Sequence, residues 1–248
     1  MTSVTLSPPF TSPAHLIPLL SQQGYAALSP QGLAELSGCS LHNLNAWRAA
    51  WNDLPPDLYL KDGGRYRRRR HSCFVVNGQR VEQAAHRAHW QPLAYNALHG
   101  GMQRWFEPLS PELISQTDWK ALLVWLGSVC SALKGERPWF VEAHQFRIDT
   151  SDGIGRPTPE GAHRDGVDLV AVLLVGREAV KGGETRVFEA TGPNGQRFTL
   201  TEPWSLLLLD DERVIHESTP IQPTGDGAYR DTLVLTYRSG GFQGDTGA

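Results

Sequence analysis

Cysteine is scarce in this sequence, with three residues in 248, at positions 39, 73 and 130. They are scattered, form no Cys-x-x-Cys pair and cannot make the even-numbered framework of a disulfide-rich domain. Reduced thiols in a cytoplasmic protein are the simplest interpretation. The cysteine content therefore favours a cytoplasmic location.

Long hydrophobic runs and a large excess of one charge are also missing. No segment approaches the about 20 apolar residues of a membrane-spanning helix, since the apolar run 205–209 is far too short. The N-terminal segment lacks a basic stretch followed by a long apolar one, so we expect no signal peptide. The net charge of −3 argues against bulk binding to nucleic acid. We expect neither a membrane nor a nucleic acid as a partner.

The length and the composition suit one globular domain, with 40% hydrophobic and 20% charged residues. In the first part of the chain, Ser12 and Ser29 are each followed by proline, which is typical of a helix start. Leu41, Leu44 and Trp47 then recur at helical spacing. We expect residues 1–56 to form a helical region packed on a β-barrel of residues 57–248, a single domain overall.

The rest of the chain has one clear helix and many short strands. Residues 117–133 show a broad apolar face at helical spacing, and we expect this helix to pack on the outside of the barrel. Strands are predicted at residues 139–148, 167–175, 184–189, 196–200, 204–209, 214–216 and 231–237. This spacing favours a sandwich or barrel over alternating β–α units. The predicted fold class is mainly β with flanking helices, as in a double-stranded β-helix, jelly-roll or cupin-like barrel.

Two histidines and an aspartate form the most informative pattern. His163 and Asp165 are two residues apart, so both side chains lie on one face of an extended segment, and His216 follows about fifty residues later. Two imidazoles and one carboxylate can hold non-haem Fe(II) on one face and leave positions open for a co-substrate and O2. We predict a metal site at these three residues.

An arginine follows at a suitable distance. Arg230 opens the last predicted strand, and Thr232 shares its face because side chains alternate along a strand. A guanidinium in a pocket can bind a carboxylate through two hydrogen bonds, and a threonine hydroxyl can add another. This pair fits the C5 carboxylate of 2-oxoglutarate. The alternatives are a surface salt bridge of Arg230 with Asp231 or Asp226, and Arg238 as the anchoring residue.

Four segments together carry a family resemblance: 159–166, 182–185, 216–221 and 229–231. With these motifs the chain resembles the Fe(II)/2-oxoglutarate dioxygenases that hydroxylate free amino acids, a group that contains isoleucine dioxygenase and related biofilm-associated proteins. The resemblance covers about residues 57–238. It implies a double-stranded β-helix with iron at His163, Asp165 and His216, and 2-oxoglutarate at Arg230.

The resemblance also implies an activity. Fe(II), 2-oxoglutarate and O2 would hydroxylate an unactivated C–H bond of a free L-amino acid or similar small molecule, releasing succinate and CO2. The alternative is a cupin-like metal-binding protein or zinc hydrolase that does not use 2-oxoglutarate. The sequence leaves the substrate and the oligomeric state open, a homodimer included.

Candidate substrate contacts come from a strand, from a loop and from a run of arginines. In the predicted strand 139–148 one face carries His144, Phe146 and Ile148 and the other carries Gln145 and Arg147; we favour Gln145 and Arg147 as ligand contacts because buried polar side chains need a reason. Glu160 can receive a substrate ammonium, or be a loop acid in solvent.

The run 65–70 contains five arginines. They can pair with acids elsewhere in the fold, which we favour, or form a nucleic-acid patch. A third interpretation has Arg67 or Arg69 at the mouth of the site, in contact with a substrate carboxylate.

Overall fold

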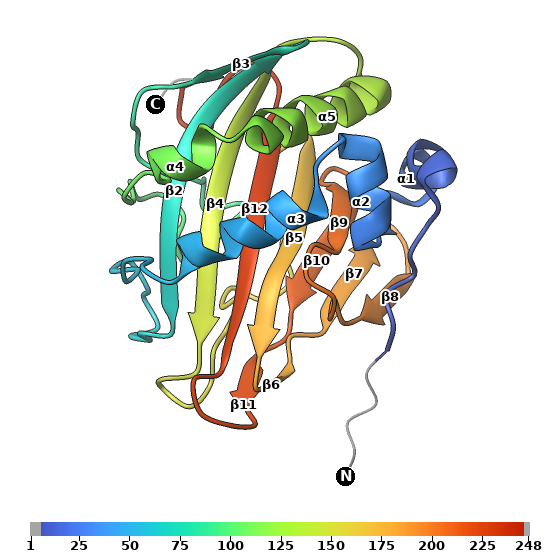
Figure 1. Ribbon diagram of the computed structural model, residues 1–248. Helices are drawn as coiled ribbons and strands as arrows, with labels where there is room; N and C mark the ends of the chain where they lie inside the picture. The colour runs from blue at the N-terminus through green and yellow to red at the C-terminus, as the bar shows by residue number, and fades with distance from the viewer. Residues whose placement is uncertain (1–5, 246–248) are drawn as a thin grey trace.

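One large antiparallel sheet has helices over its outer face and two small antiparallel sheets on its inner side (Figure 1). The structure is a computed structural model that describes residues 6–245. The larger sheet has seven strands in the order β1-β9-β5-β12-β4-β2-β3. In chain order these strands are β1 (Tyr25–Leu28), β2 (Arg67–Asn77), β3 (Arg80–Gln83), β4 (Trp139–Asp149), β5 (Leu169–Glu178), β9 (Leu206–Asp210) and β12 (Tyr229–Arg238).

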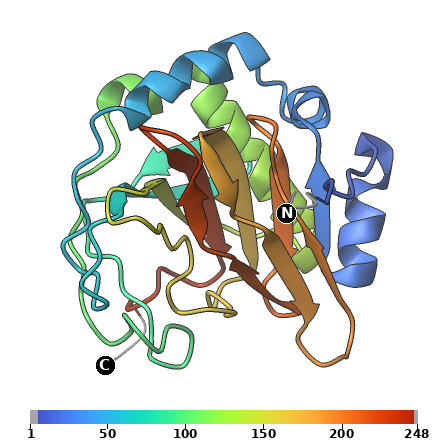
Figure 2. The ribbon, with the colours of Figure 1, turned by 90° about the horizontal axis from the view of Figure 1, so that it is seen from below.

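The remaining strands form two small sheets on the inner side. One has the order β10-β7-β8 and the other pairs β11 with β6. Their strands are β6 (Val180–Gly182), β7 (Thr185–Glu189), β8 (Gly195–Phe198), β10 (Val214–Ser218) and β11 (Ile221–Pro223). Figure 2 shows the helices on one side of the large sheet and the small strands and loops on the other. The predicted fold class, mainly β with a jelly-roll arrangement, is confirmed.

The helices are α1 (Leu16–Gln23), α2 (Pro30–Ser37), α3 (Leu41–Trp47), α4 (Pro111–Ile114) and α5 (Thr117–Lys134), with 3-10 turns at Pro13–His15 and Arg48–Trp51. The Ser29 hydroxyl accepts a hydrogen bond from the Gly32 N–H at 3.2 Å and so caps α2. Helix α5 crosses the outer face of the sheet, as expected (Figure 1). It lies so close to β2 that a Cβ on Gly127 would stand 2.9 Å from Val76.

The hydrophobic core has two layers. One layer lies between the helices and the outer face of the sheet and includes Trp51, Leu126 and Val141. The other lies between the sheets and includes Val170 and Phe198. Because side chains alternate along each strand, the inner faces of β2, β4 and β12 are free to carry polar groups.

The N-terminal region differs from the all-helical prediction. Residues Tyr25–Leu28 form β1, which pairs with β9 at the edge of the large sheet. Helices from this region share the outer core layer, while the boundary at residue 56 stays a prediction. No helix among the residues described is both long enough and apolar enough to span a membrane.

Candidate active site

A cavity lies against the inner faces of β2, β4 and β12. The strand register arranges its wall in rows. Arg230, Ile148 and Arg67 form one row across the three strands, and Thr232, Phe146 and Arg69 form the next. The long loop 84–110 closes one end with His89, Gln91, Asn96 and Arg104. The cavity therefore has a sheet wall, a loop wall and, opposite the sheet, the segment that carries the predicted metal ligands.

The predicted metal ligands converge in this cavity. His163 and His216 form an isolated antiparallel bridge, in which each backbone N–H donates to the other's carbonyl at 3.0 and 2.9 Å. Their rings therefore lie side by side, with centroids 4.6 Å apart. The Nε2 atoms of His163 and His216 each stand 3.8 Å from an oxygen of Asp165. These separations are too long for hydrogen bonds and leave room for an ion between the three side chains.

The hydrogen bond of the His163 ring leaves its Nε2 available as a metal ligand. His163 Nδ1 lies 2.9 Å from the Gly161 carbonyl oxygen, which can only accept. Nδ1 is therefore the donor, and the Nε2 lone pair faces Asp165. This arrangement is typical of a histidine that binds a metal through Nε2.

Asp211 fixes the backbone that follows the aspartate ligand. Its buried carboxylate accepts hydrogen bonds from the backbone N–H groups of Asp165, Gly166 and Val167 at 2.9, 2.7 and 3.1 Å. Burial, together with the nearby Asp165 carboxylate, raises the pKa of Asp211 to about 7. Sequence inspection missed this residue because it lies in the turn before β10, far from the motif.

The electrostatics of the triad favour binding of a cation. Burial raises the pKa of Asp165, and burial lowers the pKa of His216 well below its ordinary value. For His163, burial alone would lower the pKa, but Asp165 and Glu160 raise it above its ordinary value. A buried carboxylate beside two imidazoles is a donor set that fits Fe(II).

Arg230 is a buried guanidinium whose charge is not neutralised by an ion pair within residues 6–245. It is 3% exposed, its Nε has no hydrogen-bond partner there, and burial lowers its pKa to about 10. The predicted alternative partner, Asp231, pairs instead with Arg147. Thr232 lies beside it on the cavity wall and is 4% exposed. Because an unpaired buried charge is costly, the pair fits a bound carboxylate.

The prediction that Gln145 and Arg147 contact a ligand is wrong. Both point to the outer face of β4, away from the cavity that His144 and Phe146 line. Gln145 Nε2 donates to the Ala50 carbonyl at 3.4 Å, and Arg147 binds Asp231 with two hydrogen bonds of 2.8 and 2.7 Å. These contacts on the outer face account for the burial of both side chains. The sequence could not tell which face of β4 is turned toward the cavity.

Glu160 and Arg67 do lie in the cavity wall. Glu160 Oε1 stands 3.5 Å from His163 Nε2, and its Oε2 is buried without a partner in the described chain. Arg67 Nε donates to the buried Asp57 carboxylate at 2.7 Å.

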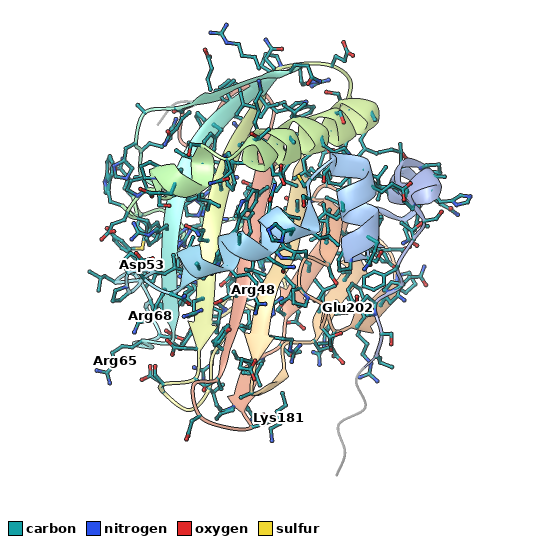
Figure 3. The ribbon with its side chains drawn as sticks, viewed as in Figure 1. Arg48, Asp53, Arg65, Arg68, Lys181 and Glu202 are labelled. Carbon is teal, nitrogen blue, oxygen red and sulfur yellow. The ribbon has the colours of Figure 1, made fainter. Side chains whose placement is uncertain are left out.

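The arginines of the run 65–70 that belong to β2 divide between its two faces because side chains alternate along a strand, and Arg65 precedes the strand. Arg67 and Arg69 face the cavity, whereas Arg65 and Arg68 point outward with 88% and 44% of the side chain exposed (Figure 3). Acidic partners lie near Arg65, Arg67, Arg68, Arg69 and Arg70, as the ion-pair interpretation expected.

A second histidine–carboxylate group lies in the same cavity region. His71, His89, Glu142 and His144 are all buried and have donor atoms within 4.8 Å of one another. The sequence alone placed His144 on one face of its strand with Phe146 and Ile148 and did not single out His89 or Glu142. A signal was present, because Glu142 and His144 share the inner face of one strand. Their meeting with His89 depends on the path of the irregular loop.

Known structures share this fold. A bsmA homologue from Methylobium petroleophilum PM1 is 56% identical, with a TM-score of 0.90, over 94% of this chain and 96% of that one. IDO from Bacillus thuringiensis is 16% identical with a TM-score of 0.73, over 96% and 97% of the two chains. The Fe(II)/(alpha)ketoglutarate-dependent dioxygenase TqaL is 20% identical with a TM-score of 0.70, over 91% and 86%. The last two likenesses concern the fold alone.

Sequence comparison gives the family. No curated protein matches the chain significantly. The family model for 2OG-Fe dioxygenases matches residues 48–236, which is more than half of the chain and includes the triad and Arg230. The protein therefore belongs to the 2OG-Fe dioxygenase family, whose members use Fe(II), 2-oxoglutarate and O2.

Proposed function

We propose that His163, Asp165 and His216 hold Fe(II) and that Arg230 and Thr232 bind 2-oxoglutarate in a dioxygenase that hydroxylates a free L-amino acid. The observation that carries the proposal is the meeting of two features in one cavity. A three-ligand set with open space between its donor atoms faces the same cavity as the buried Arg230 guanidinium, which forms no ion pair within residues 6–245.

The chain's own residues account for binding and orientation. The His163 Nδ1–H is held by the Gly161 carbonyl, so its Nε2 is directed at the metal position. Asp211 keeps the backbone of Asp165 in place. Bound Fe(II), with 2-oxoglutarate and O2, supplies the oxidising chemistry that ends in succinate, CO2 and a hydroxylated product.

The 2-oxoglutarate end of the cavity is assigned to Arg230. Its guanidinium can bind a carboxylate through two hydrogen bonds. Thr232 lies two residues further along β12, on the same face of the strand. A Cβ on Gly183 would stand 3.4 Å from Arg230 Cδ, so the turn at Gly183 lies against the arginine side chain. A zinc hydrolase would give this buried charge no partner.

The substrate is proposed to be a free amino acid because the cavity offers groups of both charges. Arg67, Arg69 and Arg104 supply positive charge in the cavity wall. Glu160 has a buried carboxylate oxygen that lacks a partner in residues 6–245. A carboxylate and an ammonium on one small molecule would satisfy both. The match to the amino-acid hydroxylase motifs supports the same class of substrate.

The test is succinate formation with Fe(II), 2-oxoglutarate and a panel of L-amino acids, with product identified by one added oxygen atom in mass spectrometry. We expect iron-dependent turnover with at least one amino acid. His163→Ala should reduce turnover to background, whereas His42→Ala, at an exposed histidine, should not. Zinc-dependent activity that needs no 2-oxoglutarate would contradict the proposal.

A further inference from the structure

Two strands away from Arg230, the cavity has a second cationic end, formed by Arg67, Arg69 and Arg104. All three are buried and line the cavity. Neighbouring strands are about 4.8 Å apart, so β2 and β12, separated by β4, place these ends about 10 Å apart. This distance is suited to two ligands bound side by side, with one at each end.

Arg69 is held in place by its neighbours, but not all of its hydrogen-bond donors have partners. Its guanidinium lies between two aromatic rings, 3.8 Å from the centroid of Phe106 and 4.5 Å from that of Phe146. Nη2 is 2.7 Å from His144 Nδ1 and Nη1 is 3.8 Å from Asp57. Nε is buried and finds no partner in the described residues. A guanidinium has five N–H donors, so several remain for a ligand.

Arg104 adds to this end of the cavity a second guanidinium with an unpaired hydrogen-bond donor. It is 2% exposed, its Nη2 donates to Gln91 Oε1 at 2.9 Å, and its Nε lacks a partner among residues 6–245. Gln91 in turn donates from Nε2 to Asp165 Oδ1 at 3.3 Å. The second cationic end is thus linked by one side chain to the triad.

The cluster of His71, His89, Glu142 and His144 supports Arg69. Its geometry is that of hydrogen bonds, since Glu142 Oε2 is 2.9 Å from His71 Nε2 and 2.6 Å from His89 Nδ1. Arginine can only donate, so His144 Nδ1 is the acceptor of the Arg69 contact and the His144 proton resides on Nε2. That Nε2–H faces Glu142 at 3.9 Å, and it cannot ligate a metal in this tautomer.

The charges leave an unmet requirement for an anion. Asp57 is occupied by Arg67 at 2.7 Å, and Glu142 is occupied by its histidines. Burial lowers the pKa of His89 to about 3 and also lowers the pKa of His71, so both rings are neutral at pH 7. Three cations therefore stand beside two carboxylates, Asp57 and Glu142, that already have partners. Glu160 lines the same cavity but forms no ion pair with any of the three arginines among the described residues.

We propose that Arg69 and Arg104 bind the carboxylate of the substrate, and that His144, which accepts a hydrogen bond from Arg69 through Nδ1, positions Arg69 for it. This rests on the proposed dioxygenase function and specifies the substrate: a small molecule with a free carboxylate. A residue within a peptide chain, or an amide, lacks the charge that this end requires.

The first test compares amino acids with their carboxamides, using wild-type protein, Fe(II), 2-oxoglutarate and succinate formation. The best amino acid of the panel should have a kcat/KM at least about 100-fold above that of its carboxamide, as expected for loss of a charge-assisted pair. Equal turnover of acid and amide would overturn the subsite. This comparison needs no variant and so does not depend on a variant's folding.

The second test uses Arg69→Met, with Arg68→Met as the matched control on the outer face of the same strand (Figure 3). Arg69→Met should raise the KM for the amino acid about 100-fold and leave the KM for 2-oxoglutarate within about 2-fold. Arg68→Met should change neither. An Arg69→Met protein with the wild-type KM for the amino acid would overturn the assignment.

The third test addresses positioning through His144. Asparagine presents an oxygen near the place of His Nδ1 and can accept from Arg69, whereas phenylalanine keeps the ring stacking but cannot accept. His144→Phe should raise the amino-acid KM about 10-fold, and His144→Asn should return it to within about 2-fold of wild type. Equal effects of the two substitutions would reduce His144 to a packing role and overturn the positioning claim.

The outcomes separate this inference from the proposed function. Iron-dependent decarboxylation of 2-oxoglutarate without any amino acid tests the Fe(II) and 2-oxoglutarate sites alone. If it is absent and no amino acid is turned over, the proposed function fails. If it is present and acid and amide are equivalent, or no amino acid stimulates it, the function of the metal site stands and the carboxylate subsite fails.

Discussion

The protein contains two clusters of histidines and carboxylates, one half-buried and one buried, that are alike in composition but differ in spacing. In the triad, both histidine Nε2 atoms are 3.8 Å from Asp165 oxygens. In the second cluster, Glu142 is 2.9 and 2.6 Å from His71 and His89. The first spacing leaves space for an ion, and the second is closed by shared protons. Residue types alone therefore do not identify a metal site.

One histidine of each cluster shows how the contact at Nδ1 determines which ring nitrogen is free. His163 faces a backbone carbonyl through Nδ1, so its proton is there and Nε2 is free. His144 faces an arginine through Nδ1, so its proton is on Nε2. A partner that accepts prepares a histidine for a metal, and a partner that donates prevents it.

The largest effect should come from removing a triad ligand. His163→Ala should lower 2-oxoglutarate turnover by at least about 1,000-fold, because the two remaining side chains cannot hold Fe(II) in the open three-ligand arrangement. Steady-state succinate formation measures this, with circular dichroism to verify folding. If the variant kept a tenth of the wild-type rate, the claim that the triad and not the Glu142 cluster holds Fe(II) would be contradicted.

The next effect separates the two cationic ends of the cavity. Arg230→Met should raise the KM for 2-oxoglutarate about 100-fold, since the buried guanidinium is the carboxylate's charge-assisted partner. Arg80→Met, at an exposed arginine of β3, is the control. If Arg230→Met raised only the amino-acid KM, the two ends would have to be exchanged.

A smaller effect is expected at Asp211. Asp211→Asn places an amide where three backbone N–H groups now find carboxylate oxygens, so the loop of Asp165 should shift. We expect about 10-fold weaker Fe(II) binding. Asp168→Asn is a matched control, because the Asp168 carboxylate accepts a hydrogen bond from the Ser239 backbone N–H at 2.7 Å and not from the loop of Asp165. It should lower the melting temperature without weakening Fe(II) binding; equal weakening in both variants would contradict a specific role of Asp211.

The smallest effect is a pH dependence of stability from the second cluster. Burial holds the pKa values of His71, His89 and His144 below the ordinary value, so these rings stay neutral in the folded protein while they protonate in the unfolded chain. Each should then cost about 1.4 kcal/mol per pH unit as pH falls below about 6.5. Chemical denaturation of metal-free protein between pH 7 and 5 should show this slope, and His89→Gln should reduce it. An unchanged slope in that variant would contradict the neutral state of His89.

Motif spacing singled out His163 and Asp165 because side chains two residues apart share a face of an extended segment, and an isolated backbone bridge places His216 beside His163. Their role as metal ligands stays a prediction. The same rule failed at β4, where both faces carry polar residues and sequence could not decide which one faces the cavity. Gln145 and Arg147 were chosen for their polarity, but Arg147 is balanced by Asp231 from the adjacent strand. Such partners become visible only when the strand order is known.

Two further features were out of reach for related reasons. Strand β1 is only four residues long and lacks a polar alternation, so it could not be told from a loop after a helix. The second cluster joins β2, β4 and the irregular loop that carries His89, and no local pattern links the three. Arg67 and Arg69 were recognisable as candidates because alternation in a strand places both on one face.

Metal stoichiometry tests the central distinction most directly. Anaerobic titration with Fe(II) should give one bound ion per chain in wild type, none at the same concentrations in His163→Ala, and one in His89→Gln. Two ions in wild type, with one lost in His89→Gln and one kept in His163→Ala, would show that the Glu142 cluster binds metal and would contradict the account.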